Sequence, residues 1–324
     1  MKRTSACTLL PLILVAACGG SGNSVGGNTP PPNEDFGITS SNAKQASKVA
    51  YQSVITSGDI ADLVGSSGLT GNGGSNFSKP DAGTQLKGAI SSLVQNIPFG
   101  PTQLPCVVSG SLTISGDLAN PLTLTAGDTV IADYDNCDDG VGEIIDGTLD
   151  FVVDVFTGDL ITGAYALTMT MDLVNFQVAT AIDVSTANGD GTATLNSMLA
   201  PYVEASASGN SMTTDTNGAT ETLSAYSSAQ TIDAGLDPAP YTMIASGTLD
   251  SSQLSGVVAY STPVMFEGFG NDYPNTGELL IDGGGSSALL VAINNVDVRI
   301  EIDSDGDGTV DDTIMTTWAE LTSP

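Results

Sequence analysis

The sequence contains no histidine, and this absence excludes several kinds of active site. Without an imidazole the chain can build neither a Ser-His-Asp triad nor a Cys-His dyad, and no zinc site with a histidine ligand. Any catalysis would have to rely on carboxylates, tyrosine, lysine or a bound metal. No spacing among the 37 acidic residues singles out a glycosidase-like carboxylate pair. We therefore expect a protein that is not an enzyme.

Basic residues are also scarce. Seven Lys and Arg residues stand against 37 Asp and Glu residues, which gives a formal net charge of −30. Phosphate backbones and anionic lipid surfaces are bound mainly by Lys and Arg. The sequence therefore predicts no nucleic-acid binding and no charge-driven docking to a membrane. The acidity itself has two interpretations, solubility in a salty or calcium-rich medium or a surface for cations or basic partners, and the first is the simpler.

The first 18 residues have the pattern of an export signal. Lys2 and Arg3 precede a short apolar run that ends at Ala17 and is too short to cross a bilayer. The run closes with Val15-Ala16-Ala17-Cys18, which resembles the lipobox of bacterial lipoproteins. The resemblance implies cleavage before Cys18 and a lipid such as palmitate on that cysteine. An ordinary signal peptide cut at the same bond is the alternative.

The segment after Cys18 suits a membrane-anchored domain. Residues 19–32 are rich in Gly, Ser and Asn and end in three prolines, a composition typical of a flexible tether. The chain is therefore expected to divide into a signal peptide (1–17), a lipidated cysteine with its tether (18–39), a helical region (40–105) and a β domain (106–324). An Asp after the lipidated cysteine would resemble the inner-membrane retention signal of enteric bacteria. Gly19 stands there instead, so the outer membrane or cell surface is the expected location.

Cysteine usage agrees with export. Cys106 and Cys137 remain after the signal peptide and the lipidated position are set aside. Outside the cytoplasm such a pair is expected to be oxidised. In the chain-entropy model, a disulfide between positions this far apart stabilises the fold by roughly 3–4 kcal/mol.

The spacing of apolar residues predicts two short N-terminal helices followed by strands. Apolar residues recur at three-to-four spacing over residues 40–64, where Gly58 is expected to end the first helix. A second helix is expected over Thr84–Asn96, stopped by Pro98. From Cys106 onward the apolar residues alternate with polar ones, which is typical of half-buried strands. The expected strands lie near 106–114, 128–134, 149–155, 165–178, 180–186, 219–227, 241–249, 254–260, 277–281, 288–302 and 313–320.

These strands predict a mainly β fold, a large antiparallel meander that forms a curved sheet, a sandwich or an open barrel. The apolar phase slips by one residue near Leu173–Asn175, which predicts a β-bulge there. Asn188–Gly191 has the composition of a hairpin turn. The phrase Gly-Thr-Leu-Asp occurs at 147–150 and again at 247–250, which we interpret as a turn glycine followed by a strand rather than as a duplication.

The most specific motif lies near the C-terminus. Its acidic residues alternate with small ones, and it resembles the DxDxDG calcium loops of EF-hands, dockerins and thrombospondin type-3 repeats. The resemblance implies a structural calcium ion of weak affinity (Kd ~10⁻⁴–10⁻³ M). Where an EF-hand closes its shell with Glu, this chain has Ile314. The flanking residues alternate like strands, so the loop is expected at the tip of a β-hairpin. The implied ligands are Asp303, Asp305, Asp307, Thr309, Asp311 and Asp312.

A second acidic segment, Asp133–Glu143, lacks the full loop spacing and is better explained as a solvated loop than as a cation site. Together these features predict a non-catalytic envelope or surface lipoprotein with structural calcium, attached to the membrane through its lipid. Two alternatives remain: a carrier for a lipid or glycan ligand, and, less favoured, a carboxylate-based hydrolase. For a binding role, both a small molecule and a protein remain open as the ligand.

Overall fold

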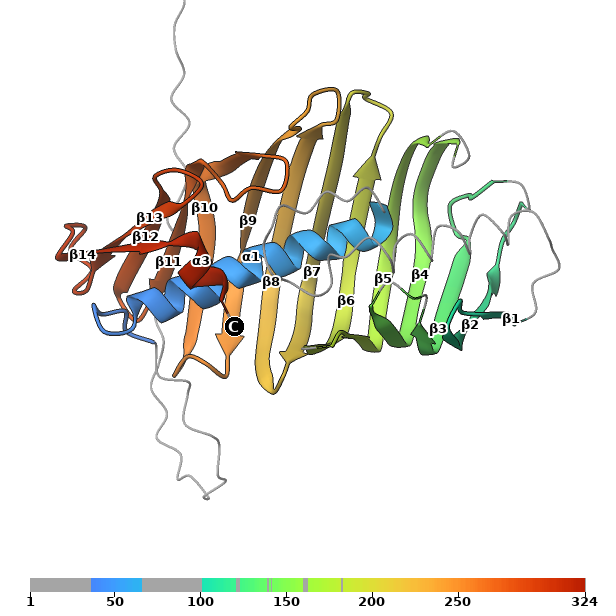
Figure 1. Cartoon of the computed structure of the whole chain (residues 1–324), viewed down its shortest axis with the longest axis horizontal. Helices are drawn as coiled ribbons and strands as arrows, with labels where there is room; N and C mark the ends of the chain where they lie inside the picture. The colour runs from blue at the N-terminus through green and yellow to red at the C-terminus, as the bar shows by residue number, and fades with distance from the viewer. Residues whose placement is uncertain are drawn as a thin grey trace, which may run out of the picture. The chain divides into compact units, whose positions relative to one another are not determined.

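The computed structural model describes residues 36–65, 101–120, 123–138, 140, 142–159, 163–181 and 183–323. Within residues 33–324, which form one compact unit, the strands build a single 14-stranded sheet in chain order (Figure 1). The strands are β1 (Thr102–Pro105), β2 (Ser109–Asp117), β3 (Thr129–Asp138), β4 (Ile144–Asp159), β5 (Ala164–Ala179), β6 (Val184–Asn196), β7 (Tyr202–Thr216), β8 (Ala219–Asp233), β9 (Pro240–Ser251), β10 (Val257–Phe269), β11 (Thr276–Gly283), β12 (Ser286–Ala292), β13 (Asp297–Asp303) and β14 (Asp312–Thr317). Among the described residues, two helices, α1 (Ala43–Gly65) and α3 (Trp318–Thr322), accompany the sheet.

The prediction of a mainly β antiparallel meander is confirmed. Every strand pairs with its neighbour in the sequence, and the described sheet has β1 and β14 at its two edges. Of the three predicted arrangements, the structure is therefore the single open sheet rather than a sandwich or a barrel. Short connections favour this topology, because consecutive antiparallel strands need only a tight turn between them.

Alternation along the strands gives the sheet two different faces. In β12 the side chains of Ser286, Ala288, Leu290 and Ala292 are buried, whereas the residues between them are half-exposed. The same alternation recurs in most of the other strands. We call the side with the buried residues the inner face and the opposite side, which is rich in Thr, Ser and Asp, the outer face. One contiguous core covers the inner face.

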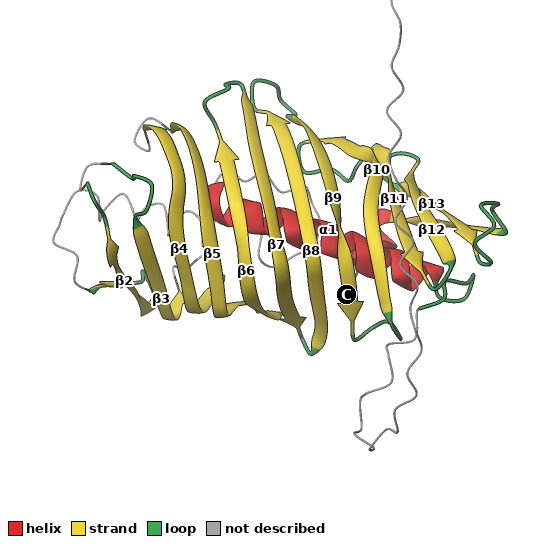
Figure 2. Cartoon of the chain, turned by 180° about the vertical axis from the view of Figure 1, so that it is seen from behind, coloured by secondary structure: helices red, strands yellow, loops and turns green. Residues whose placement is uncertain are grey.

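Helix α1 crosses the strands on the inner face (Figures 1 and 2). It contacts β6–β9 and β11–β13. Small and β-branched side chains line its buried side, among them Ala46, Val49, Ala50 and Val54, so the helix can lie close to the sheet. Burial of this apolar stripe, rather than helix propensity, is the main source of its stability.

Two short N-terminal helices were predicted. For the first of them, which lies within the described residues, the prediction is wrong. The first helix is one segment of 23 residues that continues through Gly58. Gly58 is buried, so packing against the sheet outweighs the helix penalty of about 1 kcal/mol for a glycine. The second expected helix, Thr84–Asn96, lies outside the described residues.

The short helix α3 was not predicted, and the expected strand 313–320 ends at Thr317. Thr317 caps the helix by accepting a hydrogen bond from the Glu320 amide. Trp318 follows at once and is fully buried, with its indole N–H donating to the carbonyl oxygens of Pro274 (3.2 Å) and Asn294 (3.0 Å). Burying this one large side chain explains why the chain leaves the sheet here.

The predicted bulge near Leu173–Asn175 is confirmed. The pairing of β5 with β6 shifts between Leu173 and Phe176, and Asn175 adopts a positive φ of 48°. Opposite it on β4, Gly147 has φ +92°, and a Cβ there would lie 2.1 Å from the Asn175 carbonyl oxygen. The bulge therefore brings two backbones so close that only glycine fits.

Two predictions that placed glycines in turns, at Asn188–Gly191 and at Gly247, are wrong. Asn188–Gly191 lies inside β6, where the Asn188 side chain accepts a hydrogen bond from the Asn175 amide (2.7 Å) and so stabilises the bulge. Gly247 lies inside β9 against the Tyr260 ring. Gly147 and Gly247 thus serve different purposes, and their shared phrase reflects neither a turn nor equivalent packing.

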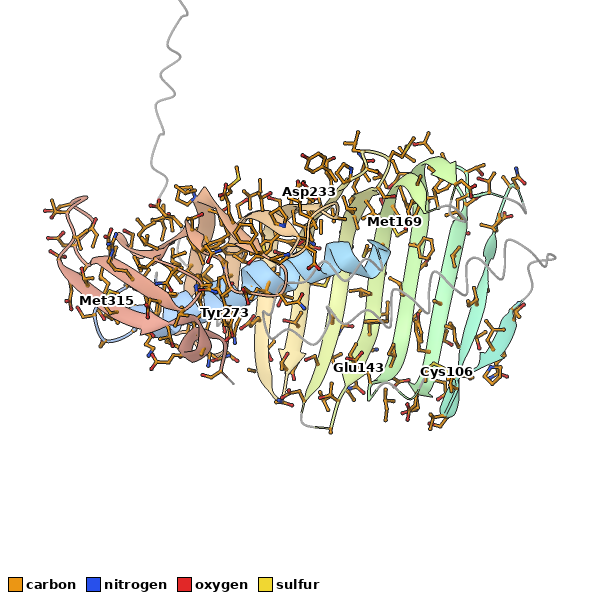
Figure 3. All side chains as sticks on the ribbon, turned by 45° about the horizontal axis from the view of Figure 1, so that its top comes forward. Cys106, Glu143, Met169, Asp233, Tyr273 and Met315 are labelled. Atoms are coloured by element: carbon orange, nitrogen blue, oxygen red, sulfur yellow. A yellow bond between two sulfur atoms is a disulfide. The ribbon has the colours of Figure 1, made fainter. Side chains whose placement is uncertain are left out.

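The predicted disulfide is confirmed. Cys106, in the connection between β1 and β2, is bonded to Cys137 on β3, and their Cα atoms are 5.5 Å apart. The bond ties the first edge of the sheet to its third strand. In Figure 3, Cys106 lies at one end of the sheet and Met315 of β14 at the other.

Candidate metal site

The acidic motif forms the loop between β13 and β14, as the sequence predicts. Val298, Ile300 and Ile302 point inward from β13, and Ile302 is paired with Asp312 at the start of β14. Residues 304–311 connect the two strands, so the loop stands at the tip of a β-hairpin at one edge of the sheet.

Two carboxylates hold the loop in shape. Asp303 accepts hydrogen bonds from the amides of Gly306 (2.7 Å) and Gly308 (2.8 Å). Asp311 accepts from both the amide (2.9 Å) and the hydroxyl (2.5 Å) of Ser304. The Ser304 hydroxyl and then its amide hold the pKa of Asp311 below its usual value. Asp311 therefore remains ionised across the pH range in which a cation would bind.

Three of these side chains converge. One carboxylate oxygen from each of Asp303, Asp305 and Asp311 lies within 4.8 Å of the other two. In water, each pair of charges at that spacing repels by about 0.9 kcal/mol, and by more where the dielectric constant is lower. Arg299, the nearest basic residue along this hairpin, is paired with Glu301 (2.8 Å) and is not part of the group. The convergence therefore concentrates negative charge that a cation would offset.

The spacing fits calcium. Calcium binds oxygen at about 2.3–2.6 Å, so two ligands on opposite sides of one ion are separated by at most ~5 Å. The three carboxylate oxygens satisfy that limit. All three ligand atoms are hard carboxylate oxygens, which calcium and magnesium prefer to nitrogen or sulfur. The loop can therefore supply part of a coordination shell, with water or backbone oxygens completing it.

The other three implied ligands lie outside this group. Asp307 accepts from the Thr309 amide (2.8 Å) and also from the Thr309 hydroxyl. The pKa of Asp312 is lowered first by the Ser40 side chain and then by the Thr313 amide, which donates to it (2.8 Å). The resemblance to calcium loops therefore named six residues, of which the structure gathers three.

The loop packs against a neighbouring turn that the sequence did not indicate. A Cβ on Gly306, which has φ +72°, would lie 2.2 Å from the carbonyl oxygen of Gly285 in the β11–β12 turn. Next to this turn, Ser286 at the start of β12 accepts a hydrogen bond from the amide of Ile38 (2.6 Å), a residue that precedes α1. The candidate metal loop thus lies next to the point where the chain enters the fold. The pairing of β12 with β13, in which Ser287 lies opposite Asp303, brings the turn next to the loop.

The second acidic segment contains no comparable group within the described residues. Asp133 accepts from the Thr148 hydroxyl (3.1 Å) and Asp138 from the Gly140 amide (2.7 Å), while Glu143 is buried. In the described chain, only the β13–β14 loop brings three acidic side chains within metal-binding distance.

Cys18 lies outside the described residues, so its lipidation stays a prediction. Neither helix in the described part of the chain combines the length and apolar character needed to cross a membrane. No protein-family model, curated protein or solved structure shows a significant match to this chain.

Proposed function

We propose that this chain is an exported, lipid-anchored envelope protein whose β domain is stabilised by calcium at the β13–β14 loop. In this proposal the domain has no catalytic role and serves in envelope structure or binding. The observation that carries the calcium part is the convergence of Asp303, Asp305 and Asp311, with one oxygen from each within 4.8 Å of the others. Calcium would be structural, because it would fasten the two strands of the edge hairpin together.

Several features support export and anchoring. The Cys106–Cys137 disulfide supports export, because disulfides persist mainly in oxidising compartments. The sequence at Val15–Cys18 resembles a lipobox, and the residues after it suit a tether. With a net charge of −30, the chain has no electrostatic attraction to an anionic membrane. A covalent lipid, palmitate for example, would then provide the attachment to the outer membrane or cell surface.

The calcium site is tested by melting the purified domain over a range of calcium concentrations. We expect millimolar calcium to raise the melting temperature and EDTA to reverse the increase, because an ion that binds only the folded state stabilises it. The expected Kd is ~10⁻⁴–10⁻³ M. An unchanged melting temperature between EDTA and about 10 mM calcium would refute the site.

Two matched variants sharpen this test. Asp305→Asn removes a charge from the group but keeps the oxygen that accepts from the Asp307 amide (3.2 Å). We expect it to weaken calcium binding by about tenfold or more, since roughly 1.4 kcal/mol corresponds to a tenfold change. Asp307→Asn makes the same chemical change in the same loop, outside the group, and should have the smaller effect. The reverse order would contradict the proposed ligand set.

A further inference from the structure

The connections from β6 to β7, from β8 to β9 and from β10 to β11 lie together at one end of the strands (Figure 1). Successive strands are antiparallel, so every second connection lies at the same end. Backbone hydrogen bonds join the three connections. The Ala234 amide donates to the Pro201 carbonyl oxygen (2.9 Å). The Gly270 amide donates to the Ala239 carbonyl oxygen (2.7 Å). The three connections therefore form one continuous surface.

Large apolar side chains are exposed along this surface. Five of them, which we call the apolar rim, are each between 47% and 57% exposed: Met198, Leu199, Tyr202, Leu236 and Phe269. A large side chain has ~150–250 Å² of surface, so the rim exposes roughly 500 Å², and a patch of that size on a monomer is often functional. At the opposite end, the connections β7–β8, β9–β10 and β11–β12 (residues 217–218, 252–256 and 284–285) are fully described and expose no large apolar side chain.

Paired strand ends and prolines hold the backbone of the rim in place. Tyr202 begins β7 and is paired with Asp233 on β8. Phe269 ends β10 and is paired with Pro240 on β9. Proline rings at positions 201, 238 and 240 fix φ in the same segments. Side chains on a backbone that is already ordered lose less conformational entropy when they dock.

The charge around the rim decides which partner it fits. The three connections contain no Lys or Arg, and Asp237 and Asp272 are exposed among the apolar side chains. Anionic lipids would therefore be repelled. A second copy would bring like carboxylates together on two chains that each have a net charge of −30. Zwitterionic head groups instead place ammonium groups opposite the carboxylates, and the boundary below them accepts separate apolar side chains without a matching surface.

We propose that the apolar rim is a lipid-contact surface, which inserts its aliphatic and aromatic side chains into the interface of a bilayer with zwitterionic head groups. Tyr202 suits this depth, because tyrosine combines an apolar ring with a polar hydroxyl and is enriched at the level of the head groups. The contact depends neither on the calcium loop nor on the lipid anchor. It would fix the orientation of the sheet on a membrane, which a flexible tether alone cannot do.

Binding of the full mature chain to vesicles tests this proposal. Cys18→Ser removes the anchor and EDTA removes calcium, so the outcome is independent of the proposed function. With vesicles of phosphatidylcholine and phosphatidylethanolamine we expect a partition constant of ~10³–10⁴ M⁻¹, so that the protein binds at millimolar lipid but is released by washing. Binding should be nearly equal at about 0.1 M and about 1 M salt, because salt screens charges and not apolar contacts. Absence of binding at about 10 mM lipid would overturn the proposal.

Two matched variants locate the contact. Leu236→Ser/Phe269→Ser removes two exposed side chains of the rim and should lower the partition constant by about tenfold or more, since binding scales with the apolar area that is inserted. Val184→Ser/Met315→Ser removes two exposed apolar side chains outside the rim and should leave the partition constant unchanged. All four side chains are exposed, so urea midpoints close to that of the wild type are expected and verify folding. Equal binding by the two variants would overturn the proposal.

Hydrogen exchange decides the question with the rim intact. When vesicles are added, exchange should slow in the three rim connections and stay unchanged in those at the opposite end. Slowing confined to other segments would contradict the proposal, as would binding that requires anionic lipid. A dimer in sedimentation that Leu236→Ser/Phe269→Ser dissociates would assign the rim to a second copy and would equally overturn it.

Discussion

Replacement of Gly147 by alanine tests the contact on which the β4–β5 bulge depends. Two penalties act on the variant. A non-glycine residue at φ +92° is strained by roughly 1–2 kcal/mol. In addition, the new Cβ would lie 2.1 Å from the carbonyl oxygen and 2.6 Å from the carbonyl carbon of Asn175. Both atoms belong to the backbone, so no side-chain rotation can relieve the overlap, and the strands must separate locally.

Gly127→Ala provides the matched control. Gly127 has nearly the same φ, +91°, but no heavy atom lies within 4 Å of its Cβ position. We expect Gly127→Ala to lose only the ~1–2 kcal/mol of backbone strain. Gly147→Ala adds steric overlap and should lose roughly 3–5 kcal/mol in total, within the range of severe single substitutions.

Urea denaturation measures both free energies of unfolding, with the fluorescence of the single tryptophan, buried Trp318, as the signal. Equal losses for the two variants would show that φ strain alone accounts for the requirement at position 147. The close approach to Asn175 would then have no energetic role, and the reasoning about the bulge would be refuted.

Two further predictions concern charge and location. Asp172 lies directly opposite Asp150, whose pKa is raised by burial and then by Asp172, so the folded state loses stability as the pH rises above about 4. Asp172→Asn should therefore gain roughly 0.5–1 kcal/mol at pH 7 and nothing near pH 2, where the Asp150 carboxyl is protonated. Urea midpoints that match the wild type at neutral pH would contradict this. Cys18→Ser should abolish palmitate labelling and release the protein from the membrane fraction, whereas a variant that remains labelled would exclude Cys18 as the lipid site.

The fold class was predictable because the alternation of apolar and polar residues can be recognised along a single strand, without knowing which strands pair with it. Alternation over residues 165–173 marks β5, and its slip marks the bulge at Asn175. By contrast, β7 was not predicted, because its buried residues are Ala205, Ala207, Met212 and Thr214, and alanine gives almost no hydropathy contrast with Ser and Thr. The predicted strand 288–302 is in fact two strands, β12 and β13. The sequence pattern does not separate them, because apolar alternation is present on both sides of the turn between them.

Errors in the prediction arose where tertiary contacts override local preference. Gly58 would stop an isolated helix, but here its helix continues because the sheet buries the adjoining apolar stripe. Asn188 and Gly189 would form a turn in a short peptide, but here Asn188 binds the Asn175 amide of the neighbouring strand. Neither partner is close in the sequence, so no local pattern could have revealed them.

The candidate metal site was likewise predictable only in those features that depend on local sequence. Spacing alone identified the loop, because alternating aspartates and glycines are a local property. It did not identify which carboxylates converge, because Asp303 and Asp311 are aimed by hydrogen bonds from Gly306, Gly308 and Ser304. Asp307 satisfies the motif equally well but is engaged by Thr309. A motif therefore specifies the residue types that can bind an ion, whereas the amide pattern of the folded loop selects the oxygens that face it.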